Sequence, residues 1–255
     1  MDKRIGAQFY TIREFCKDAE SLRESMKKVA EIGYKIIQIS GIGPIPPETV
    51  KEYADEFGLE IVVTHRPAAE YEENLDELIR YHKVLGCKYA GLGGFPGEHS
   101  MDGVKAFVEK YKPIVKKLAE NGITFMYHNH AFEFYKENGV SLMDYLLENT
   151  DPENFKFLVD TYWVVTAGVD VIEFLEKVGS RTPIVHFKDR KACSGWDPHA
   201  TMCEVGEGNL NWDKIIATCE KIGTEYALVE QDKCECDPFD ALKTSYDYLT
   251  KKGFC

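Results

Sequence analysis

Short apolar stretches alternate along the chain with longer segments whose apolar positions recur every three or four residues. The short stretches are almost continuously apolar, which is typical of parallel strands covered on both faces. We expect strands at residues 5–11, 34–40, 59–65, 88–94, 123–130, 155–160, 181–189 and 225–232. We expect helices at residues 21–33, 46–58, 74–86, 101–122, 141–150, 169–179, 211–223 and 238–253. Pro113 should kink the fourth of these helices or divide it into two joined segments.

This regular alternation predicts a single (β/α)8 TIM barrel that spans residues 1–255 as one domain. A doubly wound sheet would usually have fewer strands and a glycine-rich first turn, and the chain contains neither GxGxxG nor GxxxxGK[ST]. The long connections, at 66–73, 95–100, 131–140 and 190–210, all follow strands. In a barrel these connections lie at the catalytic mouth.

Composition narrows the classes of function. A net charge of −12 makes nonspecific binding to nucleic acid improbable, and no apolar run is long enough to span a membrane. The first residues, MDKRIGAQFY, lack the features of a secretory signal, so we expect a cytoplasmic protein. The eight cysteines are then expected to be reduced thiols. Cys234 and Cys236 lack a second pair at zinc-finger distance, which argues against a structural zinc site.

Polar side chains gather where the predicted strands end. They are Gln8, Tyr10, Gln38, His65, His128, His130, Asp160, His186, Lys188, Glu230 and Asp232. Asp160, His186 and Glu230 end three successive strands, and the carboxyl ends of parallel strands meet on one side of a sheet. Any one of them could be a hydrogen-bonded structural residue or a helix cap. Together, carboxylates and an imidazole suit a divalent cation such as Mn²⁺, Mg²⁺, Co²⁺ or Zn²⁺.

Several motifs carry a resemblance to a known family. They are YHNHAFEF (127–134), VDTYW (159–163), IVHFKDR (184–190), VGEGNLNW (205–212) and VEQD (229–232). With them the chain resembles the sugar phosphate isomerase/epimerase family, the xylose-isomerase-like TIM barrels that include inosose dehydratase, hydroxypyruvate isomerase and ketose 3-epimerases. The resemblance implies a metal, with Mn²⁺ as the expected ion, held by Glu, Asp, His and Glu. The last three match Asp160, His186 and Glu230.

Two positions depart from the pattern of the family. Relatives often have Glu at the end of the fifth strand, where this chain has His128. We therefore expect Glu133 to be the remaining metal ligand, with Glu137 as the alternative. Trp163 stands where many relatives have His, and its indole offers a stacking face for a sugar ring.

This constellation predicts an isomerase or epimerase that removes a proton next to a carbonyl through a metal-stabilised enediolate. The catalytic candidates are His128, His130 and Glu230 as bases and Lys188 as a partner of substrate oxygens. The candidates for substrate binding are His65, Trp163, Lys188 and Glu207. Lys188 could instead form a structural salt bridge with Asp160 or Asp189. The GEGN segment (206–209) could touch substrate or be a plain turn, and the 190–210 connection, with Trp196, His199, Glu204 and Glu207, could form a lid or face a partner.

Other functions remain open. A dehydratase or a lyase acting on a keto-sugar or 3-keto-glycoside would begin with the same proton abstraction. A non-catalytic sugar-binding barrel, a homo-oligomer or a subunit of a larger complex would use the same fold. The DNA-repair endonucleases on this barrel need a three-metal cluster and a basic rim, which 7 histidines and a charge of −12 do not favour. The substrate is expected to be an unphosphorylated small sugar or keto-sugar, since residues 234–237 make the last strand end acidic.

Overall fold

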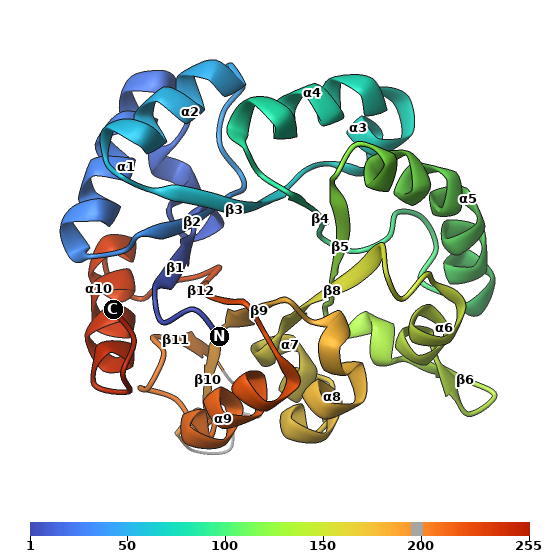
Figure 1. The fold of residues 1–255 in the computed structure, drawn as a ribbon. Coiled ribbons are helices and arrows are strands. Elements are labelled where there is room, and N and C mark those ends of the chain that lie inside the picture. Colours follow the sequence, from blue (N-terminus) through green and yellow to red (C-terminus); the bar gives the residue numbers. More distant parts are fainter. Residues whose placement is uncertain (195–200) are drawn as a thin grey trace.

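The computed structural model describes residues 1–194 and 201–255, and these form a closed barrel of parallel strands (Figure 1). Around the barrel the strands follow the order β1-β12-β9-β8-β5-β4-β3-β2. Their bounds are β1 Ile5–Gln8, β2 Ile36–Ile39, β3 Glu60–His65, β4 Tyr89–Leu92, β5 Thr124–His128, β8 Phe155–Asp160, β9 Ile184–Phe187 and β12 Tyr226–Val229. The predicted (β/α)8 architecture is therefore confirmed.

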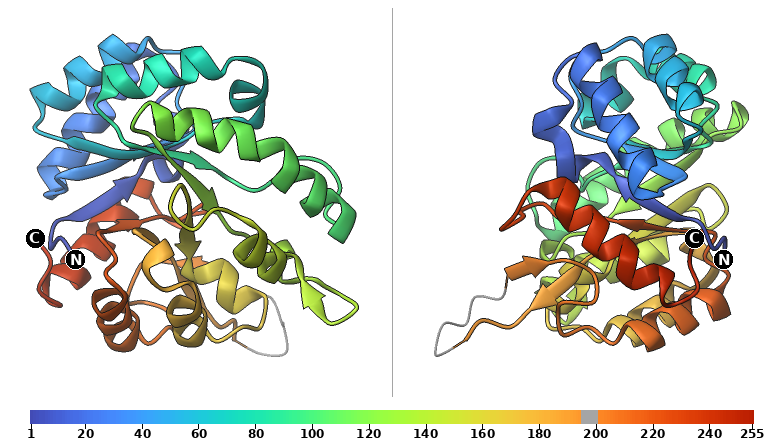
Figure 2. Two further views of the ribbon diagram at one scale, coloured as in Figure 1. Left: turned by 45° about the vertical axis from the view of Figure 1, so that its right-hand side comes forward. Right: turned by 90° about the vertical axis from the view of Figure 1, so that its left-hand side faces the viewer.

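Helices cover the outside of the barrel, and the two termini lie near each other (Figures 1 and 2). The helices are α1 Ala19–Ile32, α2 Pro47–Glu56, α3 Ala68–Glu73, α4 Leu75–Leu85, α5 Met101–Glu120, α6 Leu142–Asn149, α7 Thr161–Thr166, α8 Val171–Val178, α9 Trp212–Ile222 and α10 Pro238–Thr250. The 3₁₀ segments are η1 Phe9–Phe15, η2 Phe132–Phe134 and η3 Gly179–Arg181. Two small antiparallel ribbons pair β6 Lys136–Glu137 with β7 Val140–Ser141, and β10 Asp189–Lys191 with β11 Thr201–Cys203.

The structure corrects the sequence prediction mainly at the carboxyl ends of the strands. The first strand stops at Gln8, whose side chain accepts a hydrogen bond from Tyr10 N and begins the 3₁₀ segment η1. Helix α3 occupies part of the expected 66–73 loop. Helix α7 begins directly after Asp160, because the Asp160 carboxylate caps it by accepting from Trp163 N. These short elements have too few residues to show a periodic pattern in the sequence.

Pro113 does not divide the fourth predicted helix. Helix α5 runs without a break from Met101 to Glu120 with the proline inside it. Both Pro113 and Glu109, whose carbonyl loses its helical donor, are on the exposed face, where water can satisfy that carbonyl. Of the two expected alternatives, a kink or two joined segments, the division into two segments was wrong, because water at this exposed site can satisfy the freed carbonyl.

The inside of the barrel changes from apolar to polar along the strands. One buried apolar cluster consists of Ile36, Val62, Val63, Tyr89, Met126, Leu158, Ile184 and Leu228. Two residues after Met126, Leu158, Ile184 and Leu228 stand His128, Asp160, His186 and Glu230. Because side chains alternate across a strand with a period of two, each of these four polar residues points to the same side as the apolar residue before it. The inside of the barrel therefore has a layer of buried polar groups next to the buried apolar cluster, on the side of the strands' carboxyl ends.

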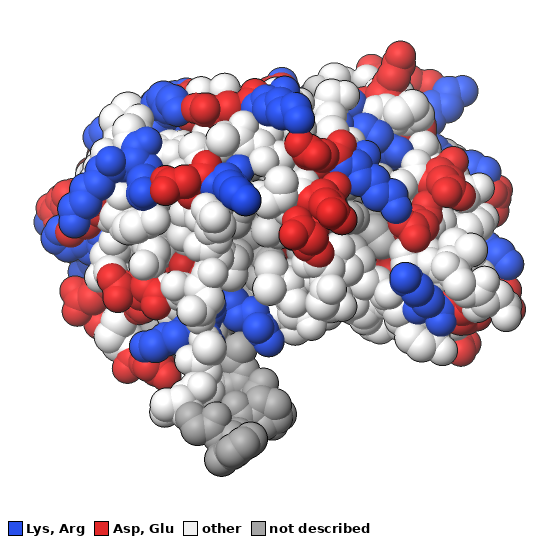
Figure 3. All heavy atoms as spheres, turned by 90° about the horizontal axis from the view of Figure 1, so that it is seen from below, with Lys and Arg blue, Asp and Glu red and all other residues white. Residues whose placement is uncertain are grey.

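Charges on the surface are mixed. On the face shown in Figure 3, basic and acidic side chains lie interspersed. Across the described residues, surface charges form pairs such as Arg23 with Glu56 and Lys117 with Asp76. Among the described residues, none of the helices has the length and apolar character needed to cross a membrane. Apart from Cys193, the cysteines are free thiols.

Candidate metal centre

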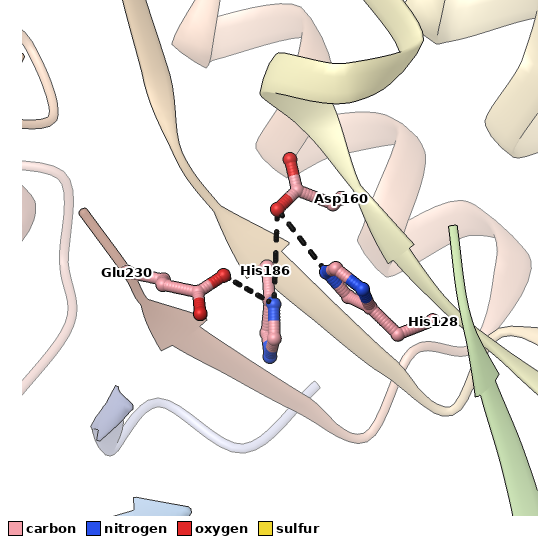
Figure 4. A group of neighbouring side chains, drawn as sticks. All are labelled: His128, Asp160, His186 and Glu230. Carbon is pink, nitrogen blue, oxygen red and sulfur yellow. Dashed lines mark hydrogen bonds and ion pairs between the residues drawn. The ribbon is translucent and has the colours of Figure 1, made fainter. Parts of the chain in front are cut away.

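Four side chains from four neighbouring strands converge at the mouth of the barrel (Figure 4). His128 ends β5, Asp160 ends β8, His186 lies in β9 and Glu230 follows β12. One potential ligand atom from each residue lies within 4.8 Å of those of the other three, and all four residues are buried. The predicted proximity of Asp160, His186 and Glu230 is thus observed, and Asp160 is directly paired with His186 in the strand register.

The His186 ring is oriented by Gln38. Nε2 of His186 lies 2.7 Å from Gln38 Oε1, so this nitrogen carries a proton and donates it. Nδ1 then faces Glu230 Oε2 at 2.9 Å and Asp160 Oδ2 at 3.8 Å. The short Glu230 contact has the distance of an ion pair but not the alignment of a hydrogen bond. A nitrogen lone pair and two carboxylate oxygens repel one another unless a proton or a metal cation lies between them.

The pKa of His186 reflects this arrangement. Burial alone would lower it, but the negative charges of Glu230 and Asp160 outweigh burial and raise the pKa. The carboxylates respond in the opposite direction. Burial would raise the pKa of Asp160, yet Lys188, His128 and His186 lower it. The same neighbours lower the pKa of Glu230, which burial would also raise. Both carboxylates are therefore ionised and able to bind a cation at neutral pH.

Asp160 divides its two oxygens between structure and the site. Oδ1 accepts from Trp163 N at 3.1 Å and caps α7, while Oδ2 lies 3.3 Å from His128 Nε2. The backbone N–H of Asp160 donates to Asn129 Oδ1 at 2.9 Å, which fixes the strand end. The other ring nitrogen of His128, Nδ1, is buried and has no hydrogen-bond partner among the described residues.

Lys188 is buried beside the same group. Its Nζ lies 2.6 Å from Asp232 Oδ1, 3.3 Å from Glu230 Oε2 and 3.5 Å from Asp160 Oδ2. Burial would lower the pKa of Lys188, but these three carboxylates together raise it, so the side chain remains an ammonium. The predicted contact with Asp160 is observed, whereas the structure has no ion pair between the described residues Lys188 and Asp189.

A cavity of about 240 Å³ lies over these residues. His65, His130 and Trp163 line it, and each has a buried ring nitrogen without a partner in the described part of the chain. Burial, together with His128, lowers the pKa of His130 to about 3, and burial also lowers that of His65, so both rings are neutral. Gly91 makes room for His65, because a Cβ at this position would lie 2.5 Å from the imidazole Cδ2.

Glu133 does not join the four converging residues, which corrects the sequence prediction. Its side chain is fully buried, accepts from Tyr127 Oη and from His130 N, both at 2.8 Å, and so ties η2 to strand β5. Tyr127 points to the opposite side of the strand from His128. Burial raises the pKa of Glu133 to about 7. Glu137, the alternative, lies in the β6–β7 ribbon and accepts from Met101 N. His128 stands in the fourth position instead.

The GEGN segment is organised by Asp189 and does not line the cavity. The buried Asp189 carboxylate accepts from the backbone N–H groups of Gly206, Gly208 and Leu210 at 2.9, 3.2 and 3.3 Å. It also accepts from Trp212 Nε1 at 2.6 Å. A Cβ on Gly208 would lie 2.2 Å from Asp189 Oδ1, so the glycine permits this close approach. Glu207 is exposed in this turn and is not brought to the cavity. Trp196 and His199 lie outside the described residues.

Three site residues were not selected from the sequence as ligands or substrate contacts. Gln38 holds His186, Gln8 donates to Glu230 Oε1 at 2.6 Å, and Asp232 binds Lys188. All three had been noted only as polar residues at strand ends. For Gln8 and Gln38 the signal is register, since they are paired in neighbouring strands. For Asp232 the signal is its spacing, since it lies two residues after Glu230.

The donor set fits a divalent cation. Two imidazole nitrogens and two ionised carboxylates would neutralise a charge of +2, and two ligands about 2.1 Å from an ion on opposite sides of it are about 4.2 Å apart. The observed spread of 4.8 Å needs only small side-chain movements to reach that geometry. Such mixed nitrogen and oxygen sets suit Mn²⁺, Co²⁺ and Zn²⁺ better than Mg²⁺, which prefers oxygen ligands.

Comparison with known proteins identifies the family. Inosose dehydratase of Geobacillus kaustophilus is 26% identical over 188 residues, which are 64% of this chain and 60% of that protein, so this match spans less than two thirds of the relative. A sugar phosphate isomerase/epimerase of Parabacteroides distasonis superposes with a TM-score of 0.80 at 25% identity, covering 97% of each chain. An L-ribulose 3-epimerase shares the fold, with a TM-score of 0.76 at 16% identity over 98% of this chain and 94% of that one. Residues 26–252 match the model of the xylose isomerase-like TIM barrels, and this chain belongs to that family.

Proposed function

We propose that the protein is a divalent-metal-dependent isomerase or epimerase of a small sugar, which works by removing a proton next to a carbonyl group. The convergence of His128, Asp160, His186 and Glu230 in one buried group carries this proposal. The related structures named as isomerases and epimerases support it. A bound cation would act as a Lewis acid that stabilises negative charge developing on the substrate.

The size and lining of the cavity support a single neutral sugar ring as the substrate. A volume of about 240 Å³ is slightly below the range of typical ligand pockets, which begins at roughly 300 Å³. The lysine that lines the cavity is Lys188. Its ammonium group is surrounded by the carboxylates of Asp160, Glu230 and Asp232. A phosphorylated substrate would have to place its own negative charges beside Asp232 and Glu230. The free ring nitrogens of His65, His130 and Trp163 suit sugar hydroxyl groups.

Lys188 and Glu230 are best placed for the proton transfer itself. Lys188, which stays protonated, would stabilise a substrate oxygen as negative charge develops on it. Glu230 stays ionised and would accept the proton, with His130 as the other candidate. His130 stays neutral, and its unpartnered ring nitrogen could accept either the proton or a hydrogen bond from a substrate hydroxyl group. His128, the third candidate base, belongs instead to the proposed ligand group.

A dehydratase or lyase is the second candidate, because inosose dehydratase is among the relatives. It would share the proton abstraction and then expel a β-leaving group. A non-catalytic sugar-binding barrel is the third. The convergence of four buried polar groups argues against it, because such an arrangement is costly to bury and sugar binding alone does not require it.

Incubation with Mn²⁺ and candidate ketoses in deuterated water tests these proposals. We expect incorporation of deuterium next to the carbonyl without loss of water or of an aglycone. In variants shown to retain Mn²⁺, Glu230→Gln should lower the exchange rate about 10²–10⁴-fold, and His130→Asn should have a smaller effect. Release of water or aglycone would show elimination instead. If a protein shown to hold the metal exchanges no deuterium into any ketose or keto-glycoside tested, the result would favour a non-catalytic sugar-binding barrel.

A further inference from the structure

A second hollow lies on the flank of the barrel mouth, on the other side of α7 from the cavity. Its volume is about 360 Å³. Val165, Val169 and Val171 line it from the α7–α8 region, and Asn209, Leu210 and Arg190 line it from the opposite side. Helix α7 separates the two spaces, since Trp163 lines the cavity and Val165 lines this hollow. We refer to it as the Arg190 hollow.

The backbone of Arg190 is fixed, but its guanidinium has no partner among the residues that the structure describes. The backbone N–H donates to Asp189 Oδ1 at 2.7 Å, and the carbonyl accepts from Asn209 N at 2.9 Å. Nε is buried, and within residues 1–194 and 201–255 no acceptor or carboxylate is bound to it. By contrast, Arg66 and Arg80 each bind glutamate carboxylates. A buried guanidinium nitrogen left unpaired costs free energy that a bound anion would recover.

The other polar side chains that line the hollow are one carboxylate and two amides. Asp170 is the acidic residue in the lining, and its Oδ1 is occupied by Ile172 N at 2.8 Å and Glu173 N at 3.0 Å. This carboxylate caps α8 and forms no ion pair with Arg190. Asn209 accepts from Ala192 N through Oδ1, which leaves its amide NH₂ as a further donor. The valines and Leu210 provide apolar contact surface beside these donors.

We propose that the Arg190 hollow binds a small organic oxyanion. A carboxylate or phosphate group of the ligand pairs with the guanidinium of Arg190, whose planar fork matches two oxygens of either group. The apolar part of the ligand packs against Val165, Val169 and Leu210. The site is separate from the four converging residues, so the proposal holds whether or not the proposed metal-dependent reaction is correct.

Titration of isotope-labelled protein with inorganic phosphate, and in parallel with acetate, tests the site by NMR. The Arg190 Nε–H signal and the methyl signals of Val165 and Val169 should shift and saturate, with a dissociation constant of about 1 mM. Tighter binding of phosphate would indicate a phosphate ester as the ligand, and tighter binding of acetate would indicate a carboxylate. Shifts that grow linearly without saturation with both anions would overturn the proposal.

Three variants localise the effect. Arg190→Gln should weaken binding at least about 10-fold, which corresponds to 1.4 kcal/mol. Arg190→Lys keeps the charge without the fork and should give an intermediate affinity. Lys191→Gln is the matched control, because it removes the same charge from the neighbouring exposed residue, and its affinity should equal that of the wild type. Equal saturation of the Val165 and Val169 signals in Arg190→Gln would show that the guanidinium is not the binding group.

Discussion

The protonation of His186 depends on a residue in another strand. Gln38 accepts from Nε2 and leaves Nδ1 directed at Asp160 and Glu230. A histidine that ligates a metal usually donates its other N–H to such a partner, which fixes its tautomer. Glu133 supports His130 in a comparable way, because its carboxylate accepts a hydrogen bond from the backbone N–H of His130. At this scale the site consists of pairs in which one side chain orients another.

Replacement of Gln38 tests this orientation. Gln38→Leu removes the acceptor of the His186 Nε2–H, so the ring can turn or change tautomer. We expect the affinity for Mn²⁺, measured by isothermal titration calorimetry, to fall about 10- to 100-fold. Ser40→Ala, which also alters the cavity lining, is the control and should keep the affinity of the wild type. An unchanged affinity in Gln38→Leu would show that Gln38 does not orient the ligand.

Glu133 gives a prediction about pH. Its pKa is about 7 in the folded protein and about 4.5 when exposed, so between these values the folded state binds a proton that the unfolded state does not. This contribution favours folding at low pH and is lost as the pH rises through 7. Glu133→Gln lacks it. The stability of the wild type relative to Glu133→Gln should therefore be lower at pH 8 than at pH 5, by on the order of 3 kcal/mol.

Urea unfolding of both proteins at the two pH values measures this difference. The same variant should bind Mn²⁺ as the wild type does, whereas Asp160→Asn should lose affinity, because only Asp160 belongs to the converging group. A loss of metal affinity in Glu133→Gln equal to that of Asp160→Asn would restore the original assignment of Glu133 as a ligand.

At the scale of elements, the connection after β9 is held by one carboxylate. Asp189 links the β10–β11 ribbon to the turn before α9 through backbone donors and the indole of Trp212. The ribbon projects from the barrel in Figure 2. Lys188, which contacts the site, and Arg190, which lines the second hollow, are the two neighbours of Asp189 in the chain. The position of this carboxylate therefore fixes the backbone beside both places.

Asp189→Asn should destabilise the protein and loosen this connection. An amide has one acceptor oxygen, and its NH₂ group would face N–H donors. We expect the free energy of unfolding to fall by about 3 kcal/mol, with faster hydrogen exchange in residues 203–212. Asp213→Asn, at an exposed position paired with Lys252, should change stability by less than about 0.5 kcal/mol. Equal stability of the two variants would contradict this role for Asp189.

At the scale of the whole molecule, the barrel closes so that four strands bring their last inward residues to one point. The buried carboxylates, imidazoles and Lys188 are costly to hold without mutual pairing. A cation that binds only the folded state would add its binding free energy to the stability of the entire barrel.

Metal should therefore raise the melting temperature. At a Mn²⁺ concentration of 100 times the dissociation constant, the gain is about 2.7 kcal/mol, or about 5–10 °C for a protein of this size. Differential scanning calorimetry with Mn²⁺ and with EDTA measures it. Asp160→Asn should show little or none of the shift. The same shift in wild type and variant would place the metal elsewhere, and no shift in the wild type would favour the non-catalytic barrel.

The sequence by itself determined the barrel and most of the candidate site. The alternation of strands and helices predicted the barrel. Apolar runs ending in Asp160, His186 and Glu230 predicted that these residues lie close together, because the carboxyl ends of parallel strands meet on one side. It also placed His128, His130 and Lys188 at the mouth.

Only the tertiary structure decided which groups face one another. Glu133 and His128 are close in the chain, yet one turns back to Tyr127 while the other faces Asp160, a difference set by strand alternation and by the η2 turn. Gln38 lies far from His186 in sequence, and only barrel closure makes them partners. Local pattern reports which face a residue occupies, but contacts between distant strands depend on register and closure, and these arise only when the whole barrel is packed.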